Sequence, residues 1–179
     1  MDSTIKPDCI IPEPYINPVN HNKSPLLINV GFLLNQQVGV SRDIHFEYPE
    51  YFLHPDLNMF DFTGVLRISR TNTGLLAQGD FRGLTQVQCV RCLEDYSHNL
   101  SATFSELYGF KGKEVSESGL VVPDDANIDF EPLVWEYLTL EIPINLVCKQ
   151  DCKGLCIVCG ENQNLKTCAH DVDMDMEKQ

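Results

Sequence analysis

The sequence predicts an α+β fold, an antiparallel β meander with one main packed helix and a C-terminal cysteine-rich zinc-knuckle tail. Three observations predict it. Apolar and polar residues alternate along much of 60–107, a helical apolar pattern follows near 131–142, and the motif CKQDCKGLCIVCG (148–160) concentrates four cysteines. With 43% apolar residues in 179, the chain can also bury a core of ordinary size.

The composition divides the chain into three parts. Residues 1–25 contain five prolines and predict an extended arm, in which Cys9 stands without a partner. Residues 26–147 form the predicted α+β domain, and residues 148–179 form a cysteine-rich zinc-binding tail packed on that domain. The start has neither a secretory signal pattern nor a membrane span, so we expect a cytoplasmic protein in a reducing compartment.

The predicted strands follow in order. Residues 26–35 and 43–53 indicate either two early strands or a strand and a short helix. The segment 60–70 alternates with period two, which predicts a strand with Phe60, Phe62, Leu66 and Ile68 on one face. TNTG (71–74) predicts a hairpin turn, and two more strands are expected at 75–89 and 97–107.

The predicted helix follows a loop. Residues 109–130 show turn and charge signals without a sustained period, so we expect a surface loop. In 131–142, Pro132 suits a first helical turn, and two adjacent apolar rows run along the helix. These rows are Leu133, Tyr137, Leu140 and Val134, Leu138, Ile142.

The cysteines are expected to bind metal. CVRC places Cys89 and Cys92 on one tight turn between two strands, which supplies half of a tetrahedral zinc site. The simplest complete partition has a first site of Cys89, Cys92, Cys148 and Cys152, and a second of Cys156, Cys159, Cys168 and His170. Cys148 and Cys152 could instead pair with Cys156 and Cys159. Either way we expect one or two structural Zn²⁺ ions, because thiolate-rich sites with four ligands leave no open catalytic position.

The charge disfavours a nucleic-acid binder. The formal net charge is −13, and residues 114–147 contain eight acidic residues and no Lys or Arg. We therefore expect a basic protein partner that meets Glu114, Glu117, Asp124, Asp125 and Asp129, with direct nucleic-acid contact as the alternative.

Two further functions remain open from the residues. A CxxC pair can cycle to a disulfide, so Cys89 and Cys92 could serve a thiol oxidoreductase or redox sensor. A zinc-ribbon nucleic-acid module is the other alternative, and it would use the arginines on the meander strands as a basic stripe.

The motifs CVRCLEDY, EPLVWEYLTLEIPINLVC and CKGLCIVCGENQNL, in that order, resemble the large ribosomal RNA subunit accumulation proteins of the YceD family. The resemblance spans roughly residues 26–170 and implies a non-enzymatic ribosome-biogenesis factor needed for accumulation of large-subunit ribosomal RNA. The family's CxRCL falls on Cys89, Arg91, Cys92 and Leu93. Ile157 replaces a common proline, and His170 stands where some relatives have cysteine.

Overall fold

The computed structural model describes residues 24–112 and 119–170, and the predicted arm lies almost wholly outside them. A four-stranded antiparallel sheet in the order β2-β3-β4-β5 forms the body, and a two-stranded sheet pairs β1 with β6. The elements are β1 (Leu27–Asn29), α1 (Gly31–Leu34), β2 (Ser41–Leu53), β3 (Leu57–Arg70), β4 (Gly74–Gln88), β5 (Asp95–Gly109), β6 (Asn127–Asp129) and α2 (Glu131–Leu140). The predicted α+β class and meander are confirmed.

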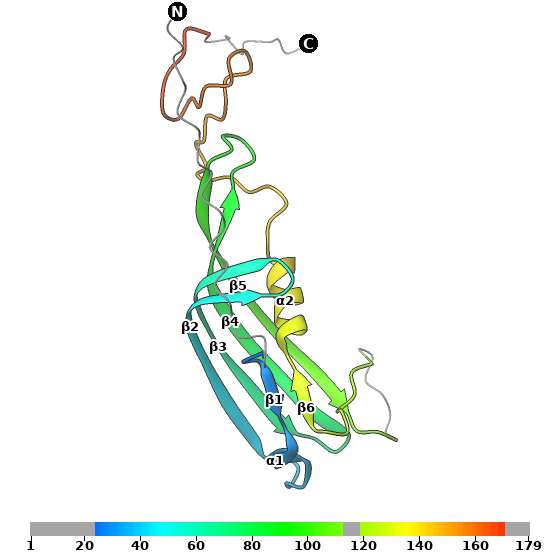
Figure 1. The fold of residues 1–179 in the computed structure, drawn as a ribbon. Helices are drawn as coiled ribbons and strands as arrows, with labels where there is room; N and C mark the ends of the chain where they lie inside the picture. The colour runs from blue at the N-terminus through cyan, green and yellow to red at the C-terminus, as the bar shows by residue number, and fades with distance from the viewer. Residues whose placement is uncertain (1–23, 113–118, 171–179) are drawn as a thin grey trace, which may run out of the picture.

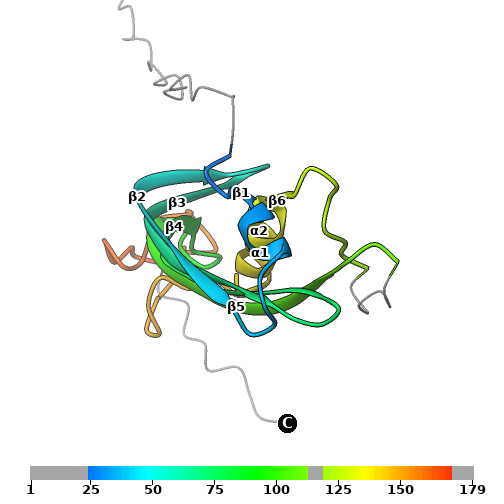
Figure 2. The ribbon, with the colours of Figure 1, turned by 90° about the horizontal axis from the view of Figure 1, so that it is seen from below.

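The large sheet curls around the helices (Figures 1 and 2). Its concave face carries the apolar side chains of each strand, including Phe62, Phe81 and Phe104, whose rings stack in sequence across the sheet. Gly64 and Gly79 lie beneath these rings, and a Cβ at Gly64 would come within 2.2 Å of Phe81. The aromatic row therefore depends on glycine at these strand positions.

The prediction for Phe60 was wrong. The pairing of β3 with β4 shifts register between Phe60 and Thr63, and Asp61 has φ 48°. Met59 and Phe62 are buried on either side of this shift, whereas Phe60 is only half-buried. A bulge reverses which residues face the core, and a strict period of two cannot reveal it.

Helix α2 is held on the sheet by polar contacts as well as apolar ones. The buried Glu131 carboxylate accepts hydrogen bonds from Tyr51 Oη and from His54 N, both at 3.1 Å. Trp135 Nε1 donates to Asp56 Oδ1 at 3.0 Å. Val134 and Leu138 are buried as predicted, but Leu140 lies at the end of the helix and is 74% exposed.

Two other predictions need correction. The segment 109–130 is not only a loop, because it contains β6, which pairs with β1 from the start of the domain. A three-residue strand is too short to show a period, so only its distant partner reveals it. The two alternatives for 26–53 are each correct in part, because the structure has two early strands, β1 and β2, with the short helix α1 between them.

The ends of β4 and β5 project beyond the sheet. Pairing between β3 and β4 is recorded as far as Phe60 and Leu84, but β4 and β5 stay paired to Gln88 and Asp95. Residues 86–97 thus form a two-stranded ribbon with the cysteine tail at its tip (Figure 1). From here on, this ribbon is called the arm, and the N-terminal segment 1–25 is not meant by that word. In the part of the chain that the structure describes, no helix has the length and apolar character of a membrane span.

Candidate metal centres

Cys89 and Cys92 lie on the turn at the tip of the arm. Cys89 N donates to Glu94 O and Leu93 N donates to Cys89 O, each at 2.9 Å, which closes the turn tightly. Leu93 has φ 58°, a left-handed conformation that the close approach of both cysteines to one point requires. The turn between two strands that the sequence predicted is therefore observed.

The segment after α2 brings Cys148 and Cys152 to the same turn. Val90 N donates to Leu146 O at 2.8 Å before these cysteines, and Leu155 N donates to Arg91 O at 3.1 Å after them. Gly154, with φ 77°, passes so close that a Cβ there would lie 3.1 Å from Arg91 O. The tail is thus fastened by its backbone to the arm on both sides of the thiols.

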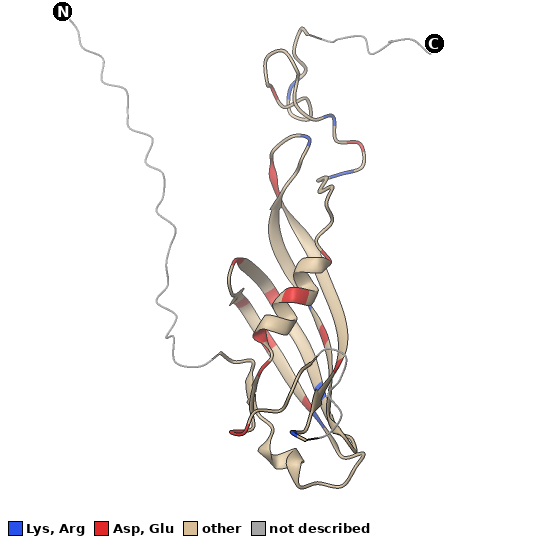
Figure 3. Cartoon of the chain, turned by 90° about the vertical axis from the view of Figure 1, so that its right-hand side faces the viewer, with Lys and Arg blue, Asp and Glu red and all other residues tan. Residues whose placement is uncertain are grey.

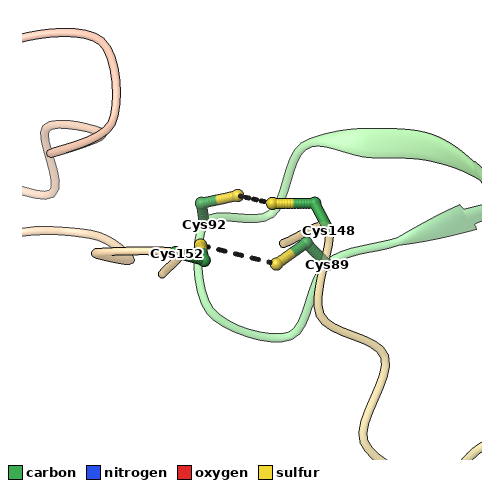
Figure 4. Close-up of side chains that lie close together, drawn as sticks. All are labelled: Cys89, Cys92, Cys148 and Cys152. Carbon is green, nitrogen blue, oxygen red and sulfur yellow. Dashed lines mark hydrogen bonds between the residues drawn. The ribbon is translucent and has the colours of Figure 1, made fainter. Parts of the chain in front are cut away.

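The four sulfurs form a compact group, here called the hairpin cluster (Cys89, Cys92, Cys148 and Cys152; Figure 4). The sulfurs of Cys89 and Cys152 are 3.9 Å apart, and those of Cys92 and Cys148 are 3.7 Å apart. Sulfurs placed tetrahedrally about 2.3 Å from a zinc ion lie about 3.8 Å from one another, whereas a disulfide needs about 2 Å. The spacing fits a tetrahedral ion and not a disulfide.

Backbone amides prepare this cluster for negative charge. Burial alone raises the pKa of Cys89, but N–H groups of Cys148, Cys92 and Arg91 donate to its sulfur and lower the pKa to about 6. By contrast, burial and the neighbouring thiols raise the pKa of Cys148 to about 12. Four thiolates in so small a buried space repel one another unless a cation compensates their charge. A divalent ion at the centre of the four sulfurs would provide this compensation.

Asn164 is a site residue that the sequence analysis missed. Its Nδ2 donates to Cys152 Sγ at 3.4 Å, and its Oδ1 accepts from Lys153 N at 2.9 Å. Such donors orient a ligand sulfur and stabilise its thiolate form. An asparagine twelve residues after a cysteine has no recognisable ligand spacing, so only the folded tail shows this contact.

The second group, here called the tail cluster, consists of Cys156, Cys159, Cys168 and His170. Its ligand atoms also lie within 4.8 Å of one another. N–H groups of Cys159 and Val158 donate to the Cys156 sulfur and lower its pKa to about 7. Cys156 is buried, but Cys159 and His170 are exposed. The eight predicted side chains therefore meet in the two groups of four that the simplest partition named.

The acidic side chains do not gather in the same way. Glu114 and Glu117 lie outside the described residues. Asp124 pairs with Lys111, Asp125 accepts a hydrogen bond from Asn127 N, and Asp129 accepts one from Glu131 N. Each of these three carboxylates thus has a local structural partner.

Curated relatives of the chain are mycobacterial. The uncharacterized protein Rv2926c of Mycobacterium tuberculosis (strain ATCC 25618 / H37Rv) is 33% identical over 101 residues, covering 53% of this chain and 48% of the relative. The uncharacterized protein ML1660 of Mycobacterium leprae (strain TN) is 30% identical over the same length, covering 53% and 46%. The match thus spans about half the length of these relatives. No solved structure matches the chain.

A family model covers both clusters. The model described as large ribosomal RNA subunit accumulation protein YceD matches residues 77–178, more than half of the chain. This range contains most of β4, the whole of β5, β6 and α2, and all eight clustered side chains. The chain belongs to the YceD family of large ribosomal RNA subunit accumulation proteins.

Proposed function

We propose that this protein is a non-enzymatic accessory factor of ribosome biogenesis, needed for accumulation of large-subunit ribosomal RNA. The family membership carries the proposal, and the two clusters indicate how the protein is built for it. Each cluster would hold one structural Zn²⁺. Four protein ligands leave no position for water or substrate, which supports a structural role for the metal rather than catalysis.

The physical need for metal is greatest in the arm. A two-stranded ribbon is marginally stable alone, and the small buried group at the tip consists of Cys89, Cys92 and Cys152, packed with Tyr96, Val147 and Cys148. This group is separate from the main apolar core. Zinc bound by the hairpin cluster would supply the cohesion that apolar side chains do not, and thiolates favour zinc among the common divalent ions.

We further propose that the functional partner is a basic protein of the large subunit or a basic assembly factor, in a reducing cytoplasm. The sequence from 114 to 147 carries eight acidic residues and no base, which suits a basic protein better than RNA. The two paired-cysteine turns, 89–93 and 156–160, also contain no aromatic residue that could stack on unpaired bases, and their exposed apolar side chains are Val90, Leu93, Ile157 and Val158.

Two measurements test the proposal. Metal analysis of protein purified under reducing conditions should find two zinc ions per chain, and zinc-free protein with a reversible Cys89–Cys92 disulfide would favour the redox alternative. Binding to purified ribosomal RNA and to basic large-subunit proteins should be compared over a range of salt concentrations. Tight RNA binding with a steep salt dependence would contradict the protein-partner proposal.

The cellular role is tested by depletion. A strain that lacks the protein should lose large-subunit ribosomal RNA while small-subunit ribosomal RNA stays at its normal level. Wild-type protein should restore the large-subunit RNA. If depletion leaves both RNAs unchanged, the family role does not extend to this chain.

A further inference from the structure

The two edges of the large sheet differ in how they are protected. On β2, Pro49 and the charged residues Arg42, Asp43, Glu47 and Glu50 discourage another strand from pairing. On β5, the stretch from Tyr96 to Ser105 contains no proline and no Asp, Glu, Lys or Arg. Its register with β4 also runs without a shift from Asp95 to Gly109. The β2 edge therefore carries residues that disfavour pairing with another strand, whereas the β5 edge is regular and lacks them.

The hydrogen bonds of Gly109 show which backbone groups of β5 face outward. Gly109 N donates to Leu120 O, and Val122 N donates to Gly109 O, each at 2.9 Å, on the side away from β4. Successive residues of a strand point their N–H and C=O groups to opposite sides. Every second residue back from Gly109 therefore directs its backbone groups to the open edge, namely Leu107, Ser105, Thr103, Ser101 and Asn99.

This edge already accepts one extended segment. The chain around Val121 forms a parallel bridge with Gly109, so β5 can pair on that side. Among the described residues the bridge covers only the end of the strand. The side chains of Asn99, Ser101, Thr103 and Ser105 are exposed farther along, where a second segment would lie.

The surroundings of the open edge are acidic on the side of α2, whereas Arg82 of β4 lies opposite Ser101 on the exposed face. Residues 95–109 and 127–141 contain no Lys or Arg. Helix α2 packs mainly against β5 and carries the exposed carboxylate Glu136, with exposed Glu141 as its C-cap. Figure 3 shows acidic and no basic residues along this helix. Because α2 packs on β5, a segment that pairs with β5 would lie near the helix that carries these carboxylates, and positive side chains on it would be complementary to their charge.

We propose that the open edge of β5 is the docking site for an extended, basic segment of the partner protein, which adds to the sheet as a further strand. Backbone hydrogen bonds from Asn99 to Leu107 supply the affinity, and Lys or Arg at alternate positions of the segment faces Glu136 and Glu141. This inference rests on the proposed function in one respect, the basic character of the partner.

Amide hydrogen exchange tests the inference directly. The probe is a synthetic peptide of about eight residues, a usual strand length, that alternates Lys with Val; a peptide that alternates Glu with Val is its control. In the free protein, the amides of Ser101, Thr103 and Ser105 should exchange quickly and those of Ala102 and Phe104 slowly. The basic peptide should slow the first set, and the acidic peptide should not.

Variants separate the edge from the rest of the molecule. Thr103→Pro removes an outward N–H while leaving the pairing with β4, and should weaken peptide binding roughly ten-fold, about the effect of one backbone hydrogen bond. Glu136→Lys leaves the β5 backbone unchanged and should weaken binding by repelling the lysines of the peptide, so it tests the inference even if Thr103→Pro does not fold. His45→Pro, at an outward position of β2, is the matched control and should bind normally.

Three results would overturn the inference. One is basic-peptide binding that leaves the outward amides of β5 unprotected, and another is the absence of binding. The third is concentration-dependent dimerisation that protects the same amides without peptide, since the edge would then belong to a second copy. If a basic large-subunit protein binds but these amides stay unprotected, the β5 edge is not the docking site, while the proposed function stands.

Discussion

The hairpin cluster and the tail cluster contain the same local structure in different settings. In the first, Cys89 N donates to Glu94 O and Leu93 N donates to Cys89 O; in the second, Cys156 N donates to Glu161 O and Gly160 N donates to Cys156 O. The residue after the second cysteine is left-handed in both, Leu93 at φ 58° and Gly160 at φ 73°. The two paired-cysteine turns therefore share one backbone form.

The two turns differ in burial and in the sequence separation of the cysteines that meet at each. In the hairpin cluster the paired sulfurs are 56 and 63 residues apart in sequence, and Cys89 is fully buried. The tail cluster lies within residues 156–170, and Cys159 is exposed. A cross-link that closes a long loop restrains the unfolded chain more than a short one does. The same type of turn thus lies where distant segments meet in the hairpin cluster, and within one short segment in the tail cluster.

The largest expected effect is loss of a hairpin ligand. Cys89→Ser should reduce bound zinc from two ions to one and loosen both the arm and the tail, because structural zinc contributes an apparent 10–16 kcal/mol to small sites. Amide exchange should become fast at Val87 and Tyr96, which pair with each other across the arm, and stay slow at 62–68. Retention of both zinc ions would contradict the assignment of Cys89.

The matched substitution in the tail cluster should have a smaller effect on the fold. Cys159→Ser should also reduce zinc from two ions to one, but the arm should keep its slow amide exchange because the tail cluster contributes no ligand to it. Limited proteolysis should cut within 156–170 more readily than in wild type. If the arm also becomes fast-exchanging, the two clusters are coupled and the comparison fails.

Removing the amide that donates to Cys152 should weaken zinc binding only at the hairpin cluster. Asn164→Ala removes the donor to Cys152 Sγ and should lower zinc affinity there by about 10–100-fold, the usual effect of losing such a contact. Competition with a chelator measures the two sites separately. Gln163→Ala is the control, since its side chain is half-buried and has no recorded contact with a cluster sulfur among the described residues. An equal loss at both sites would refute the specific role of Asn164.

Alanine substitutions at two left-handed glycines test how closely the backbone packs near each cluster. Gly154→Ala and Gly160→Ala both place a Cβ at positive φ, which costs about 1–2 kcal/mol. Only Gly154 also approaches Arg91 O, at 3.1 Å from an added Cβ, whereas nothing lies within 4 Å at Gly160. Thermal denaturation of the zinc-bound protein should show the greater loss for Gly154→Ala. Equal losses would mean that the tail does not press against the arm.

The smallest expected effect is a gain in stability. Leu93 holds the position that glycine holds in the other knuckle, and its side chain is 54% exposed. Leu93→Gly should relieve the positive-φ strain and raise stability by about 1 kcal/mol, reduced by the greater freedom of glycine in the unfolded chain. Chemical denaturation measures it. A loss of stability would show that the Leu93 side chain contributes packing that its exposure does not indicate.

Local patterns carried much of the prediction. Alternation in 62–68 and 100–104 and the apolar row through Val134 and Leu138 depend on neighbouring residues, so the strands and α2 could be located from them. Two-residue cysteine spacing likewise predicts a turn that presents two thiols, because the turn is closed by bonds within six residues. Family membership was also visible in the order of these motifs.

The sequence by itself thus determined the meander strands, helix α2 and the paired-cysteine turns, whose causes are local. Only the tertiary structure decided what depends on distant partners: the bulge between Phe60 and Thr63, the pairing of β1 with β6, and the contact of Asn164 with Cys152. It also decided that Cys148 and Cys152 join Cys89 and Cys92 rather than the later knuckle. Spacing along a chain limits which residues can meet, but the path of the backbone between them determines which ones do.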